Sequence, residues 1–484
     1  MKVSLIQLPT VAVKMYGYPG SSESGIYLGH VYREVMPLSL PRVASVIQNE
    51  VGEDVSILDL RIADPNNEEV YKGFDYEGFN MEARRVGASF DLADKVIAES
   101  DWIGLSAHFA FESHVVRDFI QHAKKLNPGV KVMVGGHDAT KRPEKYTEFG
   151  ADLVFEGDFN PEFKTGELYW HDIGKLTKPS FALLDNLESY IDSHDGPLPA
   201  GAPTPVGFIY FTRGCQRECY FCDRIERTYR KVDLESSISA LEHYQKEGIK
   251  SLNIIDENLL LQVGNNDDRQ KLIDLFRVMR DMGFAWEFPA GLEMGKLLRG
   301  SELDEELLQA LFYRSEDLSG NITGCYRTSF PVETFDEIGS LAKLKGEEGQ
   351  NKIIKWLVEH QILEVGFALV IQPWANEGTF ESTRRGYGGI TEIVANGKTN
   401  VRYGMLNAVL LGKLSNPDSE YYVKPKYSID EFPELWHFYT PTYDGRHFTA
   451  RQLFEKRMQL TKEIDSTNFG AMMRGRYGYG NSDS

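Results

Sequence analysis

Short apolar runs alternate with amphipathic segments through the first third of the chain. Runs rich in Val, Ile and Leu predict buried strands at 2–8, 55–60, 102–106, 131–134 and 152–155. Apolar positions at helical spacing predict helices at 38–50, 90–99 and 112–126. Strands that alternate with helices form parallel sheets covered on both faces. We therefore expect an α/β domain over residues 1–163, with a doubly wound, Rossmann-like parallel sheet.

The same alternation returns after residue 207. Predicted strands lie at 207–212, 251–255, 285–288, 364–371 and 401–411. Predicted helices lie between or after them at 234–247, 268–282, 303–312, 352–360 and 379–394. Repeated strand–helix units predict a partial (β/α) barrel over residues 207–415, whose sites lie at the carboxyl ends of the strands.

Two stretches lack this periodicity. Residues 164–206 contain several prolines and predict a linker: Pro179, Pro197, Pro199 and Pro203. Residues 416–484 predict a small C-terminal extension that helps to shape a substrate pocket and ends in a flexible tail at 475–484. Its aromatic residues either line that pocket or pack in a core: Trp436, His437, Tyr439 and Tyr443.

Length and charge limit the classes of function. A chain of 484 residues suggests two or three domains. A net charge of −19 argues against a large nucleic-acid interface, because phosphate contacts need clustered Lys and Arg. The first residues do not resemble a signal peptide, and no apolar run has the length of a membrane span. We expect a cytoplasmic protein without a nucleic-acid or membrane partner.

Three of the four cysteines lie in one loop after the strand predicted at 207–212: Cys215, Cys219 and Cys222. Their CxxxCxxC spacing lets a single loop bind three irons of a [4Fe–4S] cluster and leaves the fourth iron open to chelate a substrate. Arginines in the same loop add positive charge that favours thiolates: Arg213, Arg217 and Arg224.

Other interpretations of the cysteines stay open. A structural zinc site would need a fourth ligand, yet the loop contains no His, and Cys325 lies far along the chain. The three cysteines could also be ordinary core residues. Cys325 itself is either an active-site thiol or a small buried side chain.

The segment 213–222 resembles the radical S-adenosylmethionine superfamily, in which an aromatic residue precedes the third cysteine. The resemblance implies that Phe221 lies near the adenine. It also implies that Asp256 and Glu257 hold the methionine amino group, although a strand-ending turn with a helix cap explains the same motif. Two residues of a later strand resemble those that approach the ribose: Ser329 and Glu333.

The N-terminal part resembles the cobalamin-binding domain that is fused to one large class of these enzymes. The likeness lies in segments 36–46, 55–60, 103–106, 132–140 and 152–158. It implies cobalamin contacts from loops that follow the predicted strands: Ser106, His108, Gly135, Gly136, His137, Glu156 and Gly157. Taken alone, these glycines are equally typical of tight turns in any α/β sheet.

One feature of many cobalamin proteins is missing. An Asp-x-His-x-x-Gly motif, which supplies their lower axial His, does not follow the first predicted strand. His108, His114 and His137 are candidate substitutes. Radical enzymes of this type often lack the His ligand, and a domain that binds no cobalamin is the remaining alternative.

The resemblance implies a cobalamin-dependent radical S-adenosylmethionine enzyme that uses a [4Fe–4S] cluster, S-adenosylmethionine and cobalamin. The first implied activity is methyl transfer to an unactivated carbon through a 5′-deoxyadenosyl radical and methylcobalamin. A cyclase or rearrangement enzyme with the same cofactors, and a non-catalytic cobalamin-binding protein with a structural metal loop, are the alternatives. The implied partners are a small-molecule or peptide substrate and an electron donor such as flavodoxin or ferredoxin.

Overall fold

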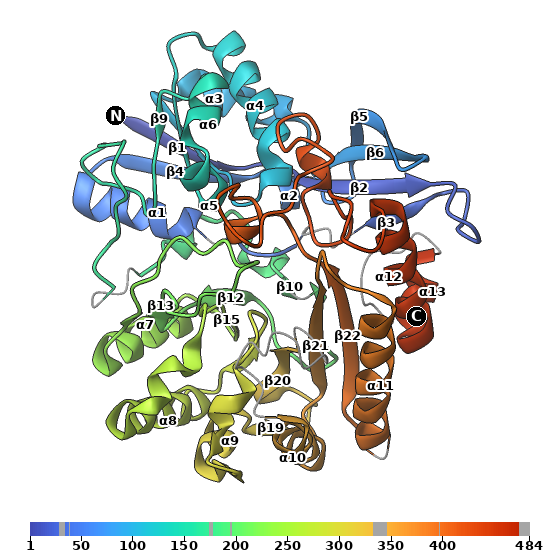
Figure 1. Cartoon of the computed structure of the whole chain (residues 1–484). Coiled ribbons are helices and arrows are strands. Elements are labelled where there is room, and N and C mark those ends of the chain that lie inside the picture. Colours follow the sequence, from blue (N-terminus) through green and yellow to red (C-terminus); the bar gives the residue numbers. More distant parts are fainter. Residues whose placement is uncertain are drawn as a thin grey trace. The chain divides into compact units, whose positions relative to one another are not determined.

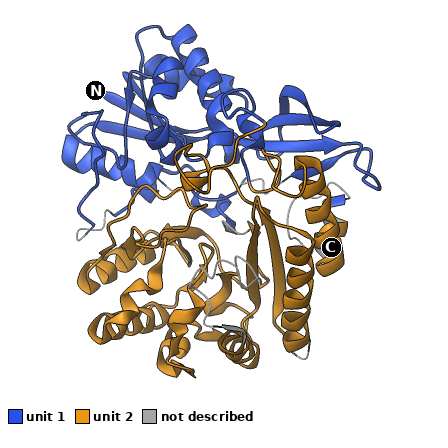
Figure 2. Ribbon diagram, viewed as in Figure 1, with its two compact units in different colours: residues 1–192, 427–437, 473–478 blue, residues 193–426, 438–472, 479–484 orange. Residues whose placement is uncertain are grey.

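A computed structural model describes residues 1–28, 34–37, 39–173, 178–193, 196–332, 346–395 and 397–473. Two compact units divide the chain (Figure 2). The first unit contains residues 1–192 and 427–437 with Met473, and the second contains 193–426 and 438–472. The limits expected at 163, 206 and 415 stay predictions, and the expected tail 475–484 lies outside the described residues.

The first unit is built on a parallel five-stranded sheet, in the order β4-β1-β7-β8-β9. Its strands are β1 (Lys2–Gln7), β4 (Asp54–Asp59), β7 (Trp102–Ser106), β8 (Lys131–Gly135) and β9 (Leu153–Val154). Its helices are α1 (Leu40–Val46), α2 (Leu60–Ala63), α3 (Asp94–Glu99), α4 (Ser113–Leu126), α5 (His137–Lys141) and α6 (Pro143–Glu148). This order is that of a doubly wound sheet whose switch point lies between β1 and β7. The predicted Rossmann-like sheet is confirmed.

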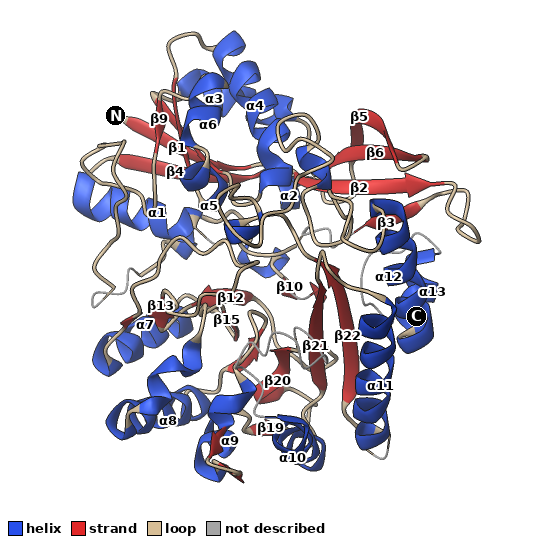
Figure 3. Ribbon diagram, in the orientation of Figure 1, coloured by secondary structure: helices blue, strands red, loops and turns tan. Residues whose placement is uncertain are grey.

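The first unit also contains a second, antiparallel sheet (Figure 3). The sequence pattern does not predict this sheet. The sheet contains β2 (Thr10–Tyr16), β3 (Ile26–Leu28), β5 (Glu68–Tyr76) and β6 (Phe79–Val86), in the order β3-β2-β6-β5. Only Tyr76 among the residues of β5 is buried, so this strand lacks the apolar run that marks a buried strand. Glu77 and Gly78 form its hairpin turn with φ values of 53° and 82°.

The second unit is an open parallel barrel (Figure 1). Six strands follow one another in chain order, with β12 and β22 at the two ends: β12 (Val206–Ile209), β15 (Ser251–Ile254), β16 (Ala285–Phe288), β20 (Ile322–Pro331), β21 (Glu364–Ile371) and β22 (Asn400–Asn407). The intervening helices are α7 (Leu234–Lys246), α8 (Asn266–Asp281), α9 (Glu305–Leu311), α10 (Gly346–Glu359) and α11 (Glu377–Val394). The predicted partial barrel is confirmed.

Smaller elements complete the chain. Short pieces pair as β10 (Asp192–Ser193) with β11 (Gly196–Pro197), β13 (Thr212–Arg213) with β14 (Arg230–Lys231), β17 (Leu298–Arg299) with β18 (Glu302–Leu303), and β19 (Arg314–Glu316) with β20. The chain continues after β22 into α12 (Ala450–Ile464) and α13 (Ser466–Met473). Within the described ranges, no helix has both the length and the apolar character needed to cross a membrane.

Side chains along the barrel strands alternate between the face toward the helices and the inner face of the barrel. On β21 and β22, Phe367 and Tyr403 are buried and lie on the side of α11, where the Tyr387 hydroxyl donates to the Phe367 carbonyl over 3.3 Å. The opposite face carries small, half-buried residues such as Gly366 and Gly404. Beside Gly366 lies the Ser329 side chain, whose Oγ would stand 2.8 Å from an added Cβ.

A buried ion cluster crosses the inner face of the barrel. The Arg327 guanidinium donates to Glu364 over 2.6 Å and to Glu287 over 3.1 Å, and its side chain is 1% exposed. Arg402 adds a second cation 3.0 Å from Glu364. Charges so deeply buried are stable only while they are paired.

Replacing Arg327 with Met should lower the free energy of unfolding by about 3–5 kcal/mol, because two carboxylates lose their buried partner. The matched control is Arg384→Met, whose partner Glu463 is 36% exposed and whose loss should change stability by less than about 1 kcal/mol. Urea titrations followed by tryptophan fluorescence measure both. Equal effects of the two substitutions would contradict this role of the cluster.

The segment 427–437 belongs to the first unit although it follows the barrel in sequence. Its Glu434 is fully buried and accepts from His114 Nδ1 over 2.7 Å and from Lys72 Nζ over 3.0 Å. The other ring nitrogen of His114 lies 3.2 Å from the Asp430 carbonyl oxygen, so both ring nitrogens face oxygen atoms. Burial raises the pKa of Glu434, but the hydrogen bond and charge of His114 and the charge of Lys72 outweigh it and lower the pKa.

A carboxylate with a lowered folded-state pKa stabilises the protein above its unfolded pKa, and this contribution is lost as the pH falls through the folded value. Unfolding free energy should therefore decrease below about pH 4.5. Glu434→Gln should remove that part of the pH dependence and destabilise by on the order of 2 kcal/mol at pH 7. Glu431→Gln, an exposed side chain in the same segment, is the control. Denaturant titrations at several pH values would refute this if both variants behaved alike.

Candidate functional site

The cysteine loop leaves the barrel directly after β12 and is closed at its base by the pairing of β13 with β14. Cys215 and Cys219 are buried and Cys222 is half-buried. Gly214 has a φ of 78°, and a side chain there would collide with the Thr228 carbonyl. The loop therefore needs glycine immediately before its first cysteine.

Asp256 anchors the start of this loop. Its buried carboxylate accepts from the backbone N–H of Phe211 at 3.1 Å, and from the Thr212 backbone and hydroxyl at 2.5 and 2.6 Å. Burial raises the pKa of Asp256 to about 7, against the opposing effect of these hydrogen bonds. The structure thus places this predicted S-adenosylmethionine contact against the loop backbone, and its role toward the ligand stays a prediction.

Glu257 holds the next part of the loop. Its carboxylate accepts from the Gly214 backbone N–H and lies 3.3 Å from Arg224 Nε. Burial opposes the charge of Arg224, but neighbouring Cys222 and Glu257 raise the pKa of its guanidinium. Positive charge thus lies beside the cysteines, as the sequence predicts.

Cys215 has two N–H groups facing its sulfur. The Arg217 backbone N–H donates over 3.4 Å, and Asn258 Nδ2 donates over 3.7 Å. Asn258 Nδ2 also lies 3.1 Å from Glu293 Oε2. Glu293 is 3% exposed and forms an ion pair with the Arg217 side chain. Glu293 thus connects these two groups, and the Arg224 side chain is a further hydrogen-bonding partner of Cys215.

The loop is also held by the segment after β22. Lys413 N–H donates to the Tyr220 carbonyl over 3.1 Å. The Tyr220 ring stacks on Tyr421 with centroids 5.0 Å apart. A side chain at Gly412 would stand 2.7 Å from the Cys222 carbonyl oxygen, so only glycine fits.

The donor set suits a cluster better than a single metal ion. Among the described residues, the side chains whose ligand atoms gather within 4.8 Å are Asp91, Asp94 and His122, and the cysteines are not among them. One zinc ion would need its sulfurs gathered around one point, whereas a cluster binds each cysteine on a different iron. Cys325 is buried in β20, where its Sγ donates to the Arg327 carbonyl over 3.4 Å, and burial raises its pKa well above the usual value.

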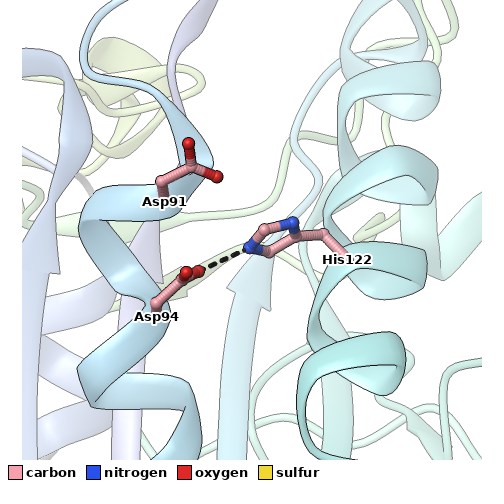
Figure 4. A group of neighbouring side chains, drawn as sticks. All are labelled: Asp91, Asp94 and His122. Carbon is pink, nitrogen blue, oxygen red and sulfur yellow. Dashed lines mark hydrogen bonds and ion pairs between the residues drawn. The ribbon is translucent and has the colours of Figure 1, made fainter.

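Figure 4 shows the group of Asp91, Asp94 and His122. His122 Nε2 lies 2.8 Å from Asp94 Oδ1, which is an ordinary His–Asp ion pair between α3 and α4. Asp91 is exposed. The geometry is explained without a metal.

The other predicted S-adenosylmethionine contacts lie on the same unit. Phe221 is half-buried beside Tyr220, with ring centroids 5.3 Å apart. Ser329 is half-buried on β20 and its carbonyl accepts from Leu292 N–H over 2.9 Å. Glu333 lies outside the described residues.

The predicted cobalamin contacts gather at the carboxyl ends of β7, β8 and β9. Ser106 pairs with Gly135 in the β7–β8 ladder, and the Ala107 N–H donates to the Gly135 carbonyl over 2.8 Å. Gly136 has a φ of 114°, and a side chain there would stand 2.5 Å from the Ala107 carbonyl oxygen. The His108 and His137 rings lie 6.1 Å apart. These loops lie beside the switch point, where doubly wound sheets bind their ligands.

The loop after β9 joins the same edge. The Gly157 N–H donates to Thr140 Oγ1 over 3.0 Å, and Gly157 bridges to Tyr169. Glu156 is half-buried, and its carbonyl accepts from the Tyr169 N–H over 3.0 Å. Their contacts with cobalamin stay predictions.

Glu112 fixes the loop that carries His108. Its carboxylate accepts from the backbone N–H groups of His108 and Phe109 at 3.1 and 3.0 Å. Burial raises the pKa of Glu112 to about 7, although the two hydrogen bonds and the charge of Arg61 oppose the shift. The rings of Phe109 and Phe111 stack with centroids 5.0 Å apart.

Several residues of the two sites escape prediction from sequence. Asn258 lies beside the predicted acidic pair, but its contact with a cysteine depends on the fold. Glu293 had one available signal, its position just after β16 in a barrel whose strand ends carry sites. Gly412 and Glu112 carry no local signal of this kind.

Comparisons with known proteins agree with this geometry. Residues 25–163 match the family model of the B12 binding domain. The chain is 23% identical over 354 residues to cytidylyl-2-hydroxyethylphosphonate methyltransferase of Streptomyces wedmorensis. The aligned region covers 62% of this chain. The match spans 61% of that relative, less than two thirds of its length. The chain is also 33% identical over 87 residues to ribosomal protein uS12 methylthiotransferase RimO of Chlorobium phaeovibrioides. That match covers 18% of this chain and 20% of RimO.

Among solved structures, the chain is similar to the cobalamin-dependent S-adenosylmethionine radical enzyme OxsB with aqua-cobalamin and S-adenosylmethionine bound. The TM-score is 0.61 at 14% identity, over 96% of this chain and 67% of that one. At this identity the likeness concerns the fold. Residues 25–163 therefore resemble the B12 binding domain, and the chain has the fold of the solved enzyme OxsB.

Proposed function

We propose that this chain is a cobalamin-dependent radical S-adenosylmethionine methyltransferase that methylates an unactivated carbon of a small molecule. The observation that carries the proposal is the three-cysteine loop at the carboxyl end of β12, in a chain that also contains a B12-binding domain. The methyltransferase relative supports methyl transfer over the other chemistries of this fold.

In this proposal a [4Fe–4S] cluster and cobalamin supply the electron and the methyl carrier when bound. Cys215, Cys219 and Cys222 hold the cluster, and no fourth residue of the loop completes it. Asp256 and Glu257 fix the backbone from which the cysteines project. In this proposal S-adenosylmethionine and the substrate bind at the carboxyl ends of the barrel strands, beside the cysteine loop.

The first test is anaerobic reconstitution with iron, sulfide and hydroxocobalamin, then desalting and incubation with S-adenosylmethionine and a strong reductant. About four irons and one cobalamin per chain, with 5′-deoxyadenosine by mass spectrometry, are expected. Cytidylyl-2-hydroxyethylphosphonate, named for the relative, is the first substrate to assay. Methylated product with S-adenosylhomocysteine supports the proposal. Deoxyadenosine without methylation points to cyclisation or rearrangement, and zinc without cleavage refutes a radical enzyme.

Each of the variants Cys215→Ala, Cys219→Ala and Cys222→Ala should lose 5′-deoxyadenosine formation, because the loop offers no replacement thiol. Cys325→Ala is the matched control, since its sulfur lies within β20 and donates to a backbone carbonyl. It should keep the iron content of the wild type. Iron analysis and mass spectrometry measure both effects. Full activity in any of the three loop variants would show that the ligand assignment is wrong.

Gly136→Ala should weaken cobalamin binding on the order of tenfold or more. Backbone strain of about 1–3 kcal/mol displaces the loops after β7 and β8, and 1.4 kcal/mol corresponds to tenfold. Gly129→Ala, in the loop before β8 with only Asn127 Oδ1 within 4 Å, is the control. Bound cobalamin is measured by absorbance after desalting, with circular dichroism to verify folding. Unchanged affinity in a folded Gly136→Ala protein would move the cobalamin site away from this edge.

A further inference from the structure

Cys215 differs from an ordinary loop cysteine because a polar network surrounds its sulfur. The neutral donors are the Arg217 backbone N–H at 3.4 Å and Asn258 Nδ2 at 3.7 Å, and the Arg224 guanidinium also hydrogen-bonds to this cysteine. Asn258 is 6% exposed, so water does not compete effectively for this contact. In such a weakly solvated position a hydrogen bond acts strongly on the charge of a thiolate.

The orientation of the Asn258 amide is dictated by its surroundings. Its Nδ2 faces the Cys215 sulfur on one side and Glu293 Oε2, 3.1 Å away, on the other. A sulfur and a carboxylate are both acceptors, so only the NH₂ end of the amide satisfies them. Glu293 thereby keeps an N–H directed at the sulfur.

Glu293 also controls the second donor. Its two oxygens contact the Arg217 side chain, with Nε 3.4 Å from Oε2. The backbone N–H of that same Arg217 is the other group that faces Cys215. Glu293 stands after β16 and Asn258 after β15, so two strand ends converge on the first cysteine of the loop.

We propose that Asn258 and Glu293 set the reduction potential of the cluster bound through Cys215, Asn258 by donating to the cysteine sulfur and Glu293 by its buried charge and by orienting both donors. The proposal rests on the proposed function, since it requires an iron–sulfur cluster. Hydrogen bonds to the sulfurs and the net charge nearby are among the factors that set such potentials. Both residues are positioning residues, because they act through Cys215.

The two residues affect the reduced cluster in opposite directions. Reduction adds one negative charge, which an N–H donor stabilises and a nearby carboxylate destabilises. Asn258→Leu removes the donor and should shift the midpoint potential to a more negative value. Glu293→Gln removes a buried negative charge, leaves the Arg217 cation without it, and should shift the potential to a more positive value. In Glu293→Gln, the loss of a full negative charge affects the potential more than any altered orientation of the neutral Asn258 amide.

The matched control is Gln262→Met. Gln262 lies in the same strand-end segment, and its amide donates to the Leu259 carbonyl over 3.1 Å rather than to a cysteine. All four proteins, including the wild type, are reconstituted anaerobically with iron and sulfide. Each is titrated with a reductant at controlled potential while the reduced cluster is followed by electron paramagnetic resonance, without S-adenosylmethionine. Iron content is measured in parallel.

Opposite shifts in Asn258→Leu and Glu293→Gln, with none in Gln262→Met, support the proposal. A purely structural role would lower iron content and leave the potential of the remaining cluster unchanged, which would overturn it. If Asn258→Leu binds no iron, Glu293→Gln decides alone: a positive shift supports the proposal and an unchanged potential overturns it. A wild-type protein that binds no cluster refutes the proposed function, and this inference with it.

Discussion

The buried carboxylate of Asp256 determines how the cysteine loop begins. Asp256 lies just after β15, and its carboxylate accepts hydrogen bonds from the backbone N–H groups of Phe211 and Thr212, which follow β12. Because β12 and β15 are paired parallel strands, their carboxyl ends lie side by side, and one acidic residue can reach across. Two of the donors are backbone N–H groups and the third is the Thr212 hydroxyl, so the constraint combines position 256 with the side chain at 212. Every later contact of the loop, from Gly214 to Cys222, starts from this fixed point.

The inner face of the barrel carries charged residues in one part and small residues in another. Arg327, Glu287 and Glu364 fill it near the start of β21 with a paired ion cluster. Farther along β21, small residues such as Gly366 and Ala368 occupy the inner face. The paired charges thus lie at the start of β21, whereas the cysteine loop follows the carboxyl end of β12. This division agrees with the general pattern of such barrels, in which one end serves stability and the other carries the site.

The sequence predicts most of the parallel strands because buried strands are continuous apolar runs, and the strand predicted at 102–106 coincides with β7. The parallel strand β20 is absent from the predicted pattern, since Thr323, Arg327 and Thr328 interrupt its apolar residues. The sequence does not predict the antiparallel sheet, since only one residue of β5 is buried and its turn, Glu77-Gly78, lacks the usual Asn-Gly or Asp-Gly signal. The same holds for the site. Cysteine spacing identifies the metal loop, whereas the contacts of Glu293 and Gly412 join segments far apart in sequence and become visible only when strand ends converge.

The fold also narrows the choice of a cobalt ligand under the proposed function. Sequence leaves three histidines near the expected sheet edge. His114 presents one ring nitrogen to Glu434 and the other to the Asp430 carbonyl, so neither is available to a metal. His108 and His137 remain, on the loops after β7 and β8. Because Glu112 holds the backbone of His108, that ring can move only about its own side-chain bonds. Of the three candidates, His108 or His137 would therefore supply a histidine ligand under the proposed function, or cobalamin binds without one.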